Sequence, residues 1–364
     1  MYIRNQDLLS SPSSCRQVVA KAVAVLKNGG LIVYPTDTLY GIGADATNQN
    51  AVNALLKYKA KRAGKPLSIA VANQHMASQY VELNDQARIL YKRYLPGPYT
   101  IISRYKKGLA QGVASEFNTV GVRIIKSQLV TDIIEALGRP ISATSANASG
   151  KKQPHSIDDI FEELSSKQKE MIQLIIDVGP LPKKEASIVI DTSISTPIVL
   201  RNNSSKRGQI TSKFSSRSAE ETQALASRLI FKHWDRVQSR GLVVALEGEL
   251  GAGKTVFAQG VANFLAISTQ VTSPSYTILK EYPFTRHNCT GFMYHLDLWR
   301  IQDAQLVEEL NLPSLVKPNN LVIIEWYSII SQAALLLRPD IVLTFKIGSD
   351  QQREIAIEEN LADT

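Results

Sequence analysis

A chain of 364 residues is long enough for two domains, and its 44% hydrophobic and 20% charged residues are ordinary for a globular protein. No apolar run is long enough to span a bilayer, and the N-terminal residues lack the apolar core of a signal peptide. Two cysteines, Cys15 and Cys289, exclude a disulfide framework and a cysteine zinc site. We therefore expect a cytoplasmic protein with no membrane contact.

The net charge of +8 is unevenly distributed. Residues 1–208 contain 27 Lys and Arg against 16 Asp and Glu, a net charge of +11, whereas residues 209–364 contain 14 against 17, a net charge of −3. A basic excess favours phosphate-rich partners such as nucleotides or RNA. A well-solvated basic surface is the alternative, because charge alone specifies no site.

In the first part of the chain, short apolar runs alternate with helical patterns. We expect buried strands over residues 31–34, 67–71 and 188–190, and helices over residues 51–58 and 129–137. This order predicts an α/β domain with an open sheet.

Residues 201–221 are polar and rich in Ser, Lys and Arg, which predicts a linker. Ser218 to Glu221 fits a capping box at the start of the next helix. We place the domain boundary between residues 208 and 209. The sequence shows no internal repeat, so the two parts are not duplicates of each other.

The second part predicts another α/β sheet flanked by helices. A helix is expected over residues 218–234, a strand over 242–246, a helix over 254–265, and strands near 293–298 and 321–324.

Residues 248–255 read GELGAGKT, which matches the phosphate-loop pattern G-x-x-x-x-G-K-[ST] in full. Glycines let backbone N–H groups surround a phosphate, and the following helix adds positive partial charge. We expect Lys254 to reach the β- and γ-phosphates and Thr255 to place its hydroxyl on Mg²⁺. The alternative is a chance glycine-rich turn.

A metal–nucleotide site also needs a carboxylate at the end of a neighbouring strand. Glu325 follows the apolar run 321–324, and Asp297 ends another predicted strand. Strand ends gather at one edge of a parallel sheet, so both are candidates for the Mg²⁺ site. The alternative for each is a surface carboxylate or a local ion pair.

The second part resembles the TsaE family, small P-loop ATPases of bacterial tRNA threonylcarbamoyladenosine synthesis, over about residues 214–350. The matching stretches are LEGELGAGKTVFAQG (246–260), VTSPSYTILKEY (271–282), HLDLWR (295–300) and IEW (324–326). Glu249 and Val256 depart mildly from the residues most common there. A guanine-binding N-K-x-D signature is missing, which favours ATP over GTP. The resemblance implies ATP contacts from Gly248, Gly251, Ala252, Gly253, Lys254, Thr255, Val256 and Trp326, and Mg²⁺ contacts from Thr255, Asp297 and Glu325.

Three polar clusters occur in the first part. They are YPTDTLYG (34–41) at a predicted strand end, the segment 57–68 with five cations in nine positions, and PISATSANASG (140–150). Hydroxyls at a strand end can hold a small polar substrate, and crowded cations favour a polyphosphate. Taken alone, each has an ordinary alternative: a turn, a solvated or RNA-contacting segment, and a Ser-rich loop.

Together these clusters resemble the YrdC/TsaC family over about residues 14–203. YPTDTLYGIG (34–43), PGPYT (96–100), GVR (121–123), TSANASG (144–150), SIVID (187–191) and VLR (199–201) follow the family's order. The family makes threonylcarbamoyl-adenylate and pyrophosphate from L-threonine, bicarbonate and ATP.

The resemblance implies a role for each matching residue. The basic cluster would hold the polyphosphate, Ser145 and Asn147 would fix a phosphate or the carbamate, and Thr36 and Arg123 would hold threonine. The implied catalytic residues are Lys59, Lys61, Arg62, Ser145 and Asn147. The implied substrate-binding residues are Thr36, Thr38, Tyr40, Lys65, Thr119, Arg123, Thr144, Ser187 and Arg201.

One departure concerns the family's K-x-R motif. Aligning on Pro66 and Leu67 places Lys59 at the lysine and Lys61 at the arginine, with Arg62 one position later. Lysine binds phosphate as a point charge and arginine as a fork, so which of Lys61 and Arg62 fills this role stays open.

The two resemblances together imply a fusion of a synthase with an ATPase that supports the TsaB–TsaD transferase acting on tRNA. An RNA-binding module coupled to an ATP-driven switch is the alternative. A small-molecule kinase is a third, for which we find no acceptor site.

Overall fold

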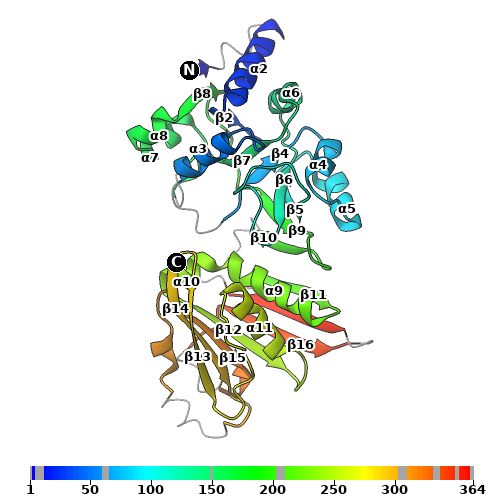
Figure 1. The fold of residues 1–364 in the computed structure, drawn as a ribbon, viewed down its shortest axis with the longest axis vertical. Helices are drawn as coiled ribbons and strands as arrows, with labels where there is room; N and C mark the ends of the chain where they lie inside the picture. Colours follow the sequence, from blue (N-terminus) through cyan, green and yellow to red (C-terminus); the bar gives the residue numbers. More distant parts are fainter. Residues whose placement is uncertain are drawn as a thin grey trace. The chain divides into compact units, whose positions relative to one another are not determined.

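The computed structural model describes residues 2–4, 12–59, 65–147, 151–201, 210–301, 310–330, 337–348 and 352–360. The chain divides into two compact units, residues 1–193 with 199–203 and residues 194–198 with 204–364. Both are α/β units with mixed sheets (Figure 1), which confirms the predicted fold class.

The described strands of the first unit form one sheet in the order β1-β8-β2-β3-β7-β4-β6-β5-β9-β10. They are β1 (Tyr2–Arg4), β2 (Leu31–Pro35), β3 (Tyr40–Gly43), β4 (Ser68–Ala70), β5 (Tyr99–Arg104), β6 (Thr119–Arg123), β7 (Ile141–Ser145), β8 (Ile172–Asp177), β9 (Ile188–Asp191) and β10 (Ile198–Arg201). The helices are α2 (Pro12–Lys27), α3 (Gln49–Lys59), α4 (Gln74–Tyr80), α5 (Asp85–Tyr94), α6 (Gln128–Leu137), α7 (Ile157–Glu163) and α8 (Ser166–Glu170).

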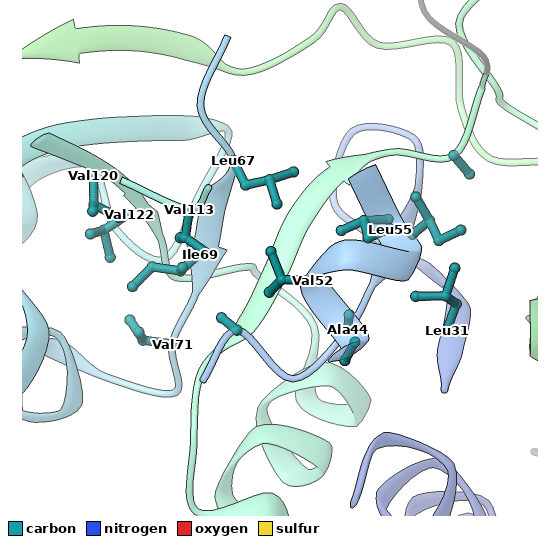
Figure 2. Close-up of a cluster of buried hydrophobic side chains, with 14 of the residues drawn as sticks. Leu31, Ala44, Val52, Leu55, Leu67, Ile69, Val71, Val113, Val120 and Val122 are labelled. Carbon is teal, nitrogen blue, oxygen red and sulfur yellow. The ribbon is translucent and has the colours of Figure 1, made fainter. Parts of the chain in front are cut away.

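Two hydrophobic clusters hold this sheet to its helices. In one, α3 packs its apolar side against the sheet, and Figure 2 shows Val52 and Leu55 among Leu31, Ala44 and Leu67. In the other, α2 and α6 pack together on residues such as Leu26 and Ile133. Burying both kinds of face away from water is the main stabilising contribution to this unit.

The described strands of the second unit form a sheet in the order β11-β17-β16-β12-β15-β14-β13. They are β11 (Ile210–Ser216), β12 (Leu242–Gly248), β13 (Leu279–Arg286), β14 (Cys289–Asp297), β15 (Leu321–Glu325), β16 (Ile341–Ile347) and β17 (Arg353–Glu359). The helices are α9 (Ala219–Lys232), α10 (Trp234–Arg240), α11 (Lys254–Phe264) and the 3-10 turns η1 (Leu312–Leu315) and η2 (Tyr327–Ile330).

The expectation of a linker over residues 201–221 is wrong for its second half. Residues 210–216 form β11, which pairs antiparallel with β17 along its whole length. The backbone hydrogen bonds of a ladder do not depend on side-chain polarity, and the buried residues Phe214 and Ser216 anchor the strand. Residues 202–209 lie outside the described part of the chain.

The helix predicted over residues 218–234 is present as α9, which ends at Lys232, and a second helix, α10, follows from Trp234. α9 begins after Ser218, whose side chain accepts from the Glu221 N–H as expected of an N-cap. Glu221 bonds the N–H of Arg217 instead of that of Ser218, so the predicted capping box is only half formed. The helical path breaks at His233, where the buried imidazole bonds Glu359.

Candidate functional sites

The first unit contains a cavity of about 330 Å³ at the centre of its sheet. Its wall is formed by residues of β2 and the turn that follows it, of β4 to β7, and of β9 and β10. Eight residues singled out from the sequence line it: Thr36, Thr38, Lys65, Arg123, Thr144, Ser145, Ser187 and Arg201. The three clusters, which are separated by up to a hundred residues in the chain, therefore meet at one site.

Among the described residues, three cationic side chains line this cavity: Lys65, Arg123 and Arg201. Arg123 Nη2 lies 2.7 Å from Asp37 Oδ1, and both side chains are less than a tenth exposed. Arg201 donates to the backbone oxygen and the hydroxyl of Ser187 at 2.8 and 2.9 Å. Burial, and secondly the charge of Arg123, lower the pKa of Arg201 from its ordinary value. Two guanidinium groups near enough to repel each other favour an anion between them.

The ion pair of Arg123 and Asp37 is incomplete. Arg123 Nε and Asp37 Oδ2 are buried and have no hydrogen-bond partner among the described residues. An unsatisfied buried group costs about 1–3 kcal/mol, so a ligand that bonds both atoms would gain that energy.

Four other described residues from the sequence prediction do not line the cavity: Tyr40, Thr119, Lys59 and Asn147. Tyr40 and Thr119 are buried, and their hydroxyls bond Gly179 O and Ser115 Oγ. Lys59 is 5% exposed, and its Nζ donates to the carbonyls of Ser145 and Asn147 at 2.8 and 2.7 Å.

Asn147 in turn donates to the carbonyls of Lys151 and Lys152. Lys59 and Asn147 thus hold the loop that carries Ser145. Lys61 and Arg62 lie outside the described residues.

Sequence reasoning missed several residues of this cavity. Thr100 bonds Ser187 at 2.8 Å, and Ser68 and Gln153 lie on the wall. Tyr34, the first residue of the YPTDTLYG cluster, also lines the cavity; its hydroxyl donates to Ser142 O, and burial raises its pKa. Thr100, Ser68 and Gln153 give no signal of their own in the sequence, because a lone Thr, Ser or Gln is equally common on a protein surface.

The second unit contains a cavity of about 250 Å³ at the carboxyl ends of β12, β14 and β15. Predicted residues that line it are Gly251, Gly253, Lys254, Thr255, Val256, Asp297, Glu325 and Trp326. Gly248 and Ala252 do not. Ala252 is buried. Gly248 is the last residue of β12 and has a φ of 134°, and a Cβ added there would lie 2.4 Å from Phe345 O.

Lys254 folds back over the glycine-rich loop. Its Nζ donates to the carbonyls of Gly248 and Glu249 at 2.6 and 2.9 Å and lies 4.2 Å from the ring centroid of Trp326. Burial lowers the pKa of Lys254, against the opposing effects of Glu325 and Asp297. These contacts hold the ammonium group at the glycine-rich loop, on the wall of the cavity.

The two carboxylates meet because of strand register. Asp297 and Glu325 are partners in the parallel pair of β14 and β15. Glu325 Oε1 accepts from Thr255 Oγ1 at 3.1 Å and lies 3.0 Å from His295 Nε2. Asp297 Oδ2 accepts from the hydroxyls of Ser273 and Ser275, which belong to the TSPSY loop.

Comparisons with known proteins agree with this arrangement. A family described as "Telomere recombination" (Sua5/YciO/YrdC) matches residues 24–203, and the TsaE threonylcarbamoyl adenosine biosynthesis family matches residues 216–355. A Methanocaldococcus jannaschii protein, provisionally assigned as a threonylcarbamoyl-AMP synthase, is 35% identical over 45% of this chain and 74% of its own length. The threonylcarbamoyl-AMP synthase of Bacillus subtilis is 32% identical over 56% of this chain and 58% of its own.

Solved structures give the same fold. A variant of P. abyssi Sua5 is 25% identical with a TM-score of 0.51, covering 73% of this chain and 74% of that one. A P. abyssi Sua5 structure with L-threonine has a TM-score of 0.50 at 21% identity over 89% and 91% of the two chains, which supports the fold alone.

The chain therefore belongs to the Sua5/YciO/YrdC family of enzymes and carries a TsaE domain after it. Within the described residues, no helix combines the length and apolar character needed to cross a membrane.

Proposed function

We propose that the first unit makes threonylcarbamoyl-AMP and pyrophosphate from L-threonine, bicarbonate and ATP, and that the second hydrolyses ATP to support a TsaB–TsaD transferase that modifies tRNA. The observation that carries the proposal is the convergence of Arg123, Arg201 and Lys65 on one hydroxyl-lined cavity in a unit of this family. We place the boundary between the two activities at residues 208 and 209, and the protein in the cytoplasm.

The synthase reaction needs no side-chain nucleophile. The threonine amine takes up bicarbonate with loss of water, and an oxygen of the resulting carbamate attacks the α-phosphate while pyrophosphate leaves. Such chemistry depends on positioning and charge neutralisation. Arg123 would bind the threonine carboxylate, and Lys65 and Arg201 would neutralise the phosphates.

The partners of Arg123 give its role a mechanism. In the free chain Asp37 holds the guanidinium in place. A substrate carboxylate would bond the spare Arg123 Nε, and Asp37 Oδ2 would accept from the substrate's hydroxyl or amine. Thr36 and Thr38, whose hydroxyls lie 3.1 Å apart at the turn after β2, would complete this end of the cavity.

In the second unit, Thr255, Glu325 and Asp297 offer the hard oxygen donors that Mg²⁺ prefers, within one cavity beside the glycine-rich loop. The residues fit the ion, which when bound would neutralise charge on the ATP phosphates. Lys254 and the loop backbone would bind the phosphates. Trp299 and Trp326, with ring centroids 4.4 Å apart, would cover the nucleotide from one side.

The test is pyrophosphate release by the full chain. We expect release to require threonine and bicarbonate together, and Arg123→Ala to lower kcat/KM for threonine about 10- to 100-fold, the loss of one charged hydrogen-bond pair. Release without threonine, or RNA binding with no release at all, would reject the synthase in favour of the RNA-binding module.

A further inference from the structure

A second cavity of the first unit, separate from the proposed synthase site, has the features of a ligand site. Its volume is about 430 Å³, and it lies just beyond the carboxyl ends of β4 and β6, a parallel strand pair. Ala72 follows β4 and Ile124 follows β6, and both line it. Crevices beyond the carboxyl ends of parallel strands are where open α/β sheets bind ligands.

The polar wall of this cavity comes from one face of α5 and from Asn73 and Gln74 at the start of α4. Its charged groups lie on α5. Arg88 and Lys92 are spaced four residues apart and so project on the same side of the helix. Both side chains are exposed, and neither forms an ion pair or hydrogen bond with the part of the chain that the structure describes. No described carboxylate lines the cavity, so these charges are not neutralised within it.

Tyr91, between these two cations in sequence, is only 2% exposed and also lines the cavity. Its hydroxyl is buried without a hydrogen-bond partner among the described residues. A buried hydroxyl left unpaired is costly, and native structures usually pair such groups with protein, water or ligand. The rest of the floor is apolar, formed by residues such as Leu95 and Ile124.

We propose that this cavity binds a phosphate-bearing ligand of about mononucleotide size. Arg88 and Lys92 would hold the phosphate, Tyr91 would donate to a polar atom of the ligand, and Leu95 and Ile124 would contact its apolar body. The phosphate belongs either to a free nucleotide or to one nucleotide of a single-stranded RNA. The site is independent of the synthase and ATPase assignments.

Hydrogen–deuterium exchange of the full chain locates such binding directly, using AMP as the probe. We expect AMP to slow exchange at least twofold in residues 72–80 and 85–96. The double variant Arg88→Ala and Lys92→Ala should need an AMP concentration at least tenfold higher for the same protection. The matched control, Arg93→Ala with Lys107→Ala, removes two exposed cations outside the cavity and should leave it unchanged.

Further probes identify the source and test the hydroxyl. If an oligoribonucleotide protects these segments at a lower concentration than AMP does, the ligand is RNA. If AMP protects them at the lower concentration, the ligand is a free nucleotide. Tyr91→Phe, which removes only the hydroxyl, should weaken AMP binding about threefold or more.

No protection of residues 85–96 by any of these probes, or equal protection in the Arg88 and Lys92 double variant, would overturn the proposal. Unchanged affinity in Tyr91→Phe would overturn the role of Tyr91. Slower exchange of residues 140–147 and 248–256 in the same samples would indicate ligand binding at the proposed synthase and ATPase sites. Binding at those two sites is therefore measured separately from binding at this cavity.

Discussion

Lys59 illustrates how a residue singled out for one role is found in another. The sequence places it in a basic cluster, which suggests a side chain facing a polyphosphate. In the free chain its ammonium group instead bonds the carbonyls of Ser145 and Asn147, nearly out of contact with solvent. The sequence singles out Lys59, but only the tertiary path of residues 145–147 shows that its side chain bonds their carbonyls.

Lys59→Met should therefore destabilise the first unit even without substrate. The apolar side chain leaves two buried carbonyls unpaired, at a cost of about 1–3 kcal/mol. Urea unfolding without ligands measures this loss, and Lys57→Met, an exposed neighbour on the same helix, serves as the control. Equal stability of the two variants would show that the contacts of Lys59 contribute nothing.

Two glycines of the phosphate-binding loop should differ in their tolerance of a side chain. At Gly248 a Cβ would lie 2.4 Å from Phe345 O, whereas at Gly251 nothing lies within 4 Å, although both have positive φ. Gly248→Ala should cost about 3 kcal/mol or more, from strain plus overlap, and Gly251→Ala about 1 kcal/mol from strain alone. Chemical denaturation of the two variants should show this order, and the reverse order would contradict the geometry.

At the scale of elements, apolar patterns predicted most of what forms the cores. The expected strands near residues 31, 188, 242 and 321 and the helices near residues 51, 129 and 254 are present, since each has an apolar face or run to bury. β11 could not be predicted in this way. Its sequence ITSKFSS is polar, and its pairing with β17 depends on residues more than a hundred positions away.

Glu359, at the end of β17, links that strand to the junction of α9 and α10. Its oxygens lie 2.8 Å from Lys232 Nζ and 2.7 Å from His233 Nε2, and Glu359 is 4% exposed. Glu359→Gln should cost about 2 kcal/mol or more at neutral pH, because it leaves the partly buried Lys232 ammonium group without its counter-charge.

The pH dependence of that cost follows from the pKa of Glu359. Burial acts to raise this pKa, but the bonds from His233 and the charge of Lys232 outweigh it, so the folded-state pKa is below the ordinary 4.5. The stabilisation is therefore complete above the unfolded-state pKa and disappears as pH falls through the folded-state value. The difference between wild type and Glu359→Gln in urea unfolding should shrink below pH 4.5; a difference that grew there would contradict this sign.

At the scale of the whole molecule, two units with separate cores and separate cavities predict separate unfolding. Calorimetry of the full chain should resolve two transitions instead of a single two-state one. Glu359→Gln should lower only the transition of the second unit, and Lys59→Met only that of the first. A single transition shifted by both variants would mean that the two units unfold together as one cooperative unit.

The candidate sites were predictable to different degrees. The glycine-rich loop of the second candidate site could be predicted because one contiguous pattern carries it, and the proximity of Asp297 and Glu325 because both end predicted strands. The first site depends on segments that no local rule brings together, so its residues came from a resemblance. The Asp37 partner of Arg123 and the wall residues Thr100 and Gln153 became visible only in the fold.

The central claim is that one chain carries two independent ATP-using sites, and a crossed pair of variants tests it most directly. Threonine- and bicarbonate-dependent pyrophosphate release and phosphate release from ATP are measured on full-length Arg123→Ala and Lys254→Ala, with TsaB and TsaD present for the second assay. We predict that Arg123→Ala lowers pyrophosphate release at subsaturating threonine about 10- to 100-fold and keeps ATP hydrolysis. Lys254→Ala should lose ATP hydrolysis and keep pyrophosphate release. Loss of both activities in either variant would contradict independence, and loss of neither would reject both site assignments.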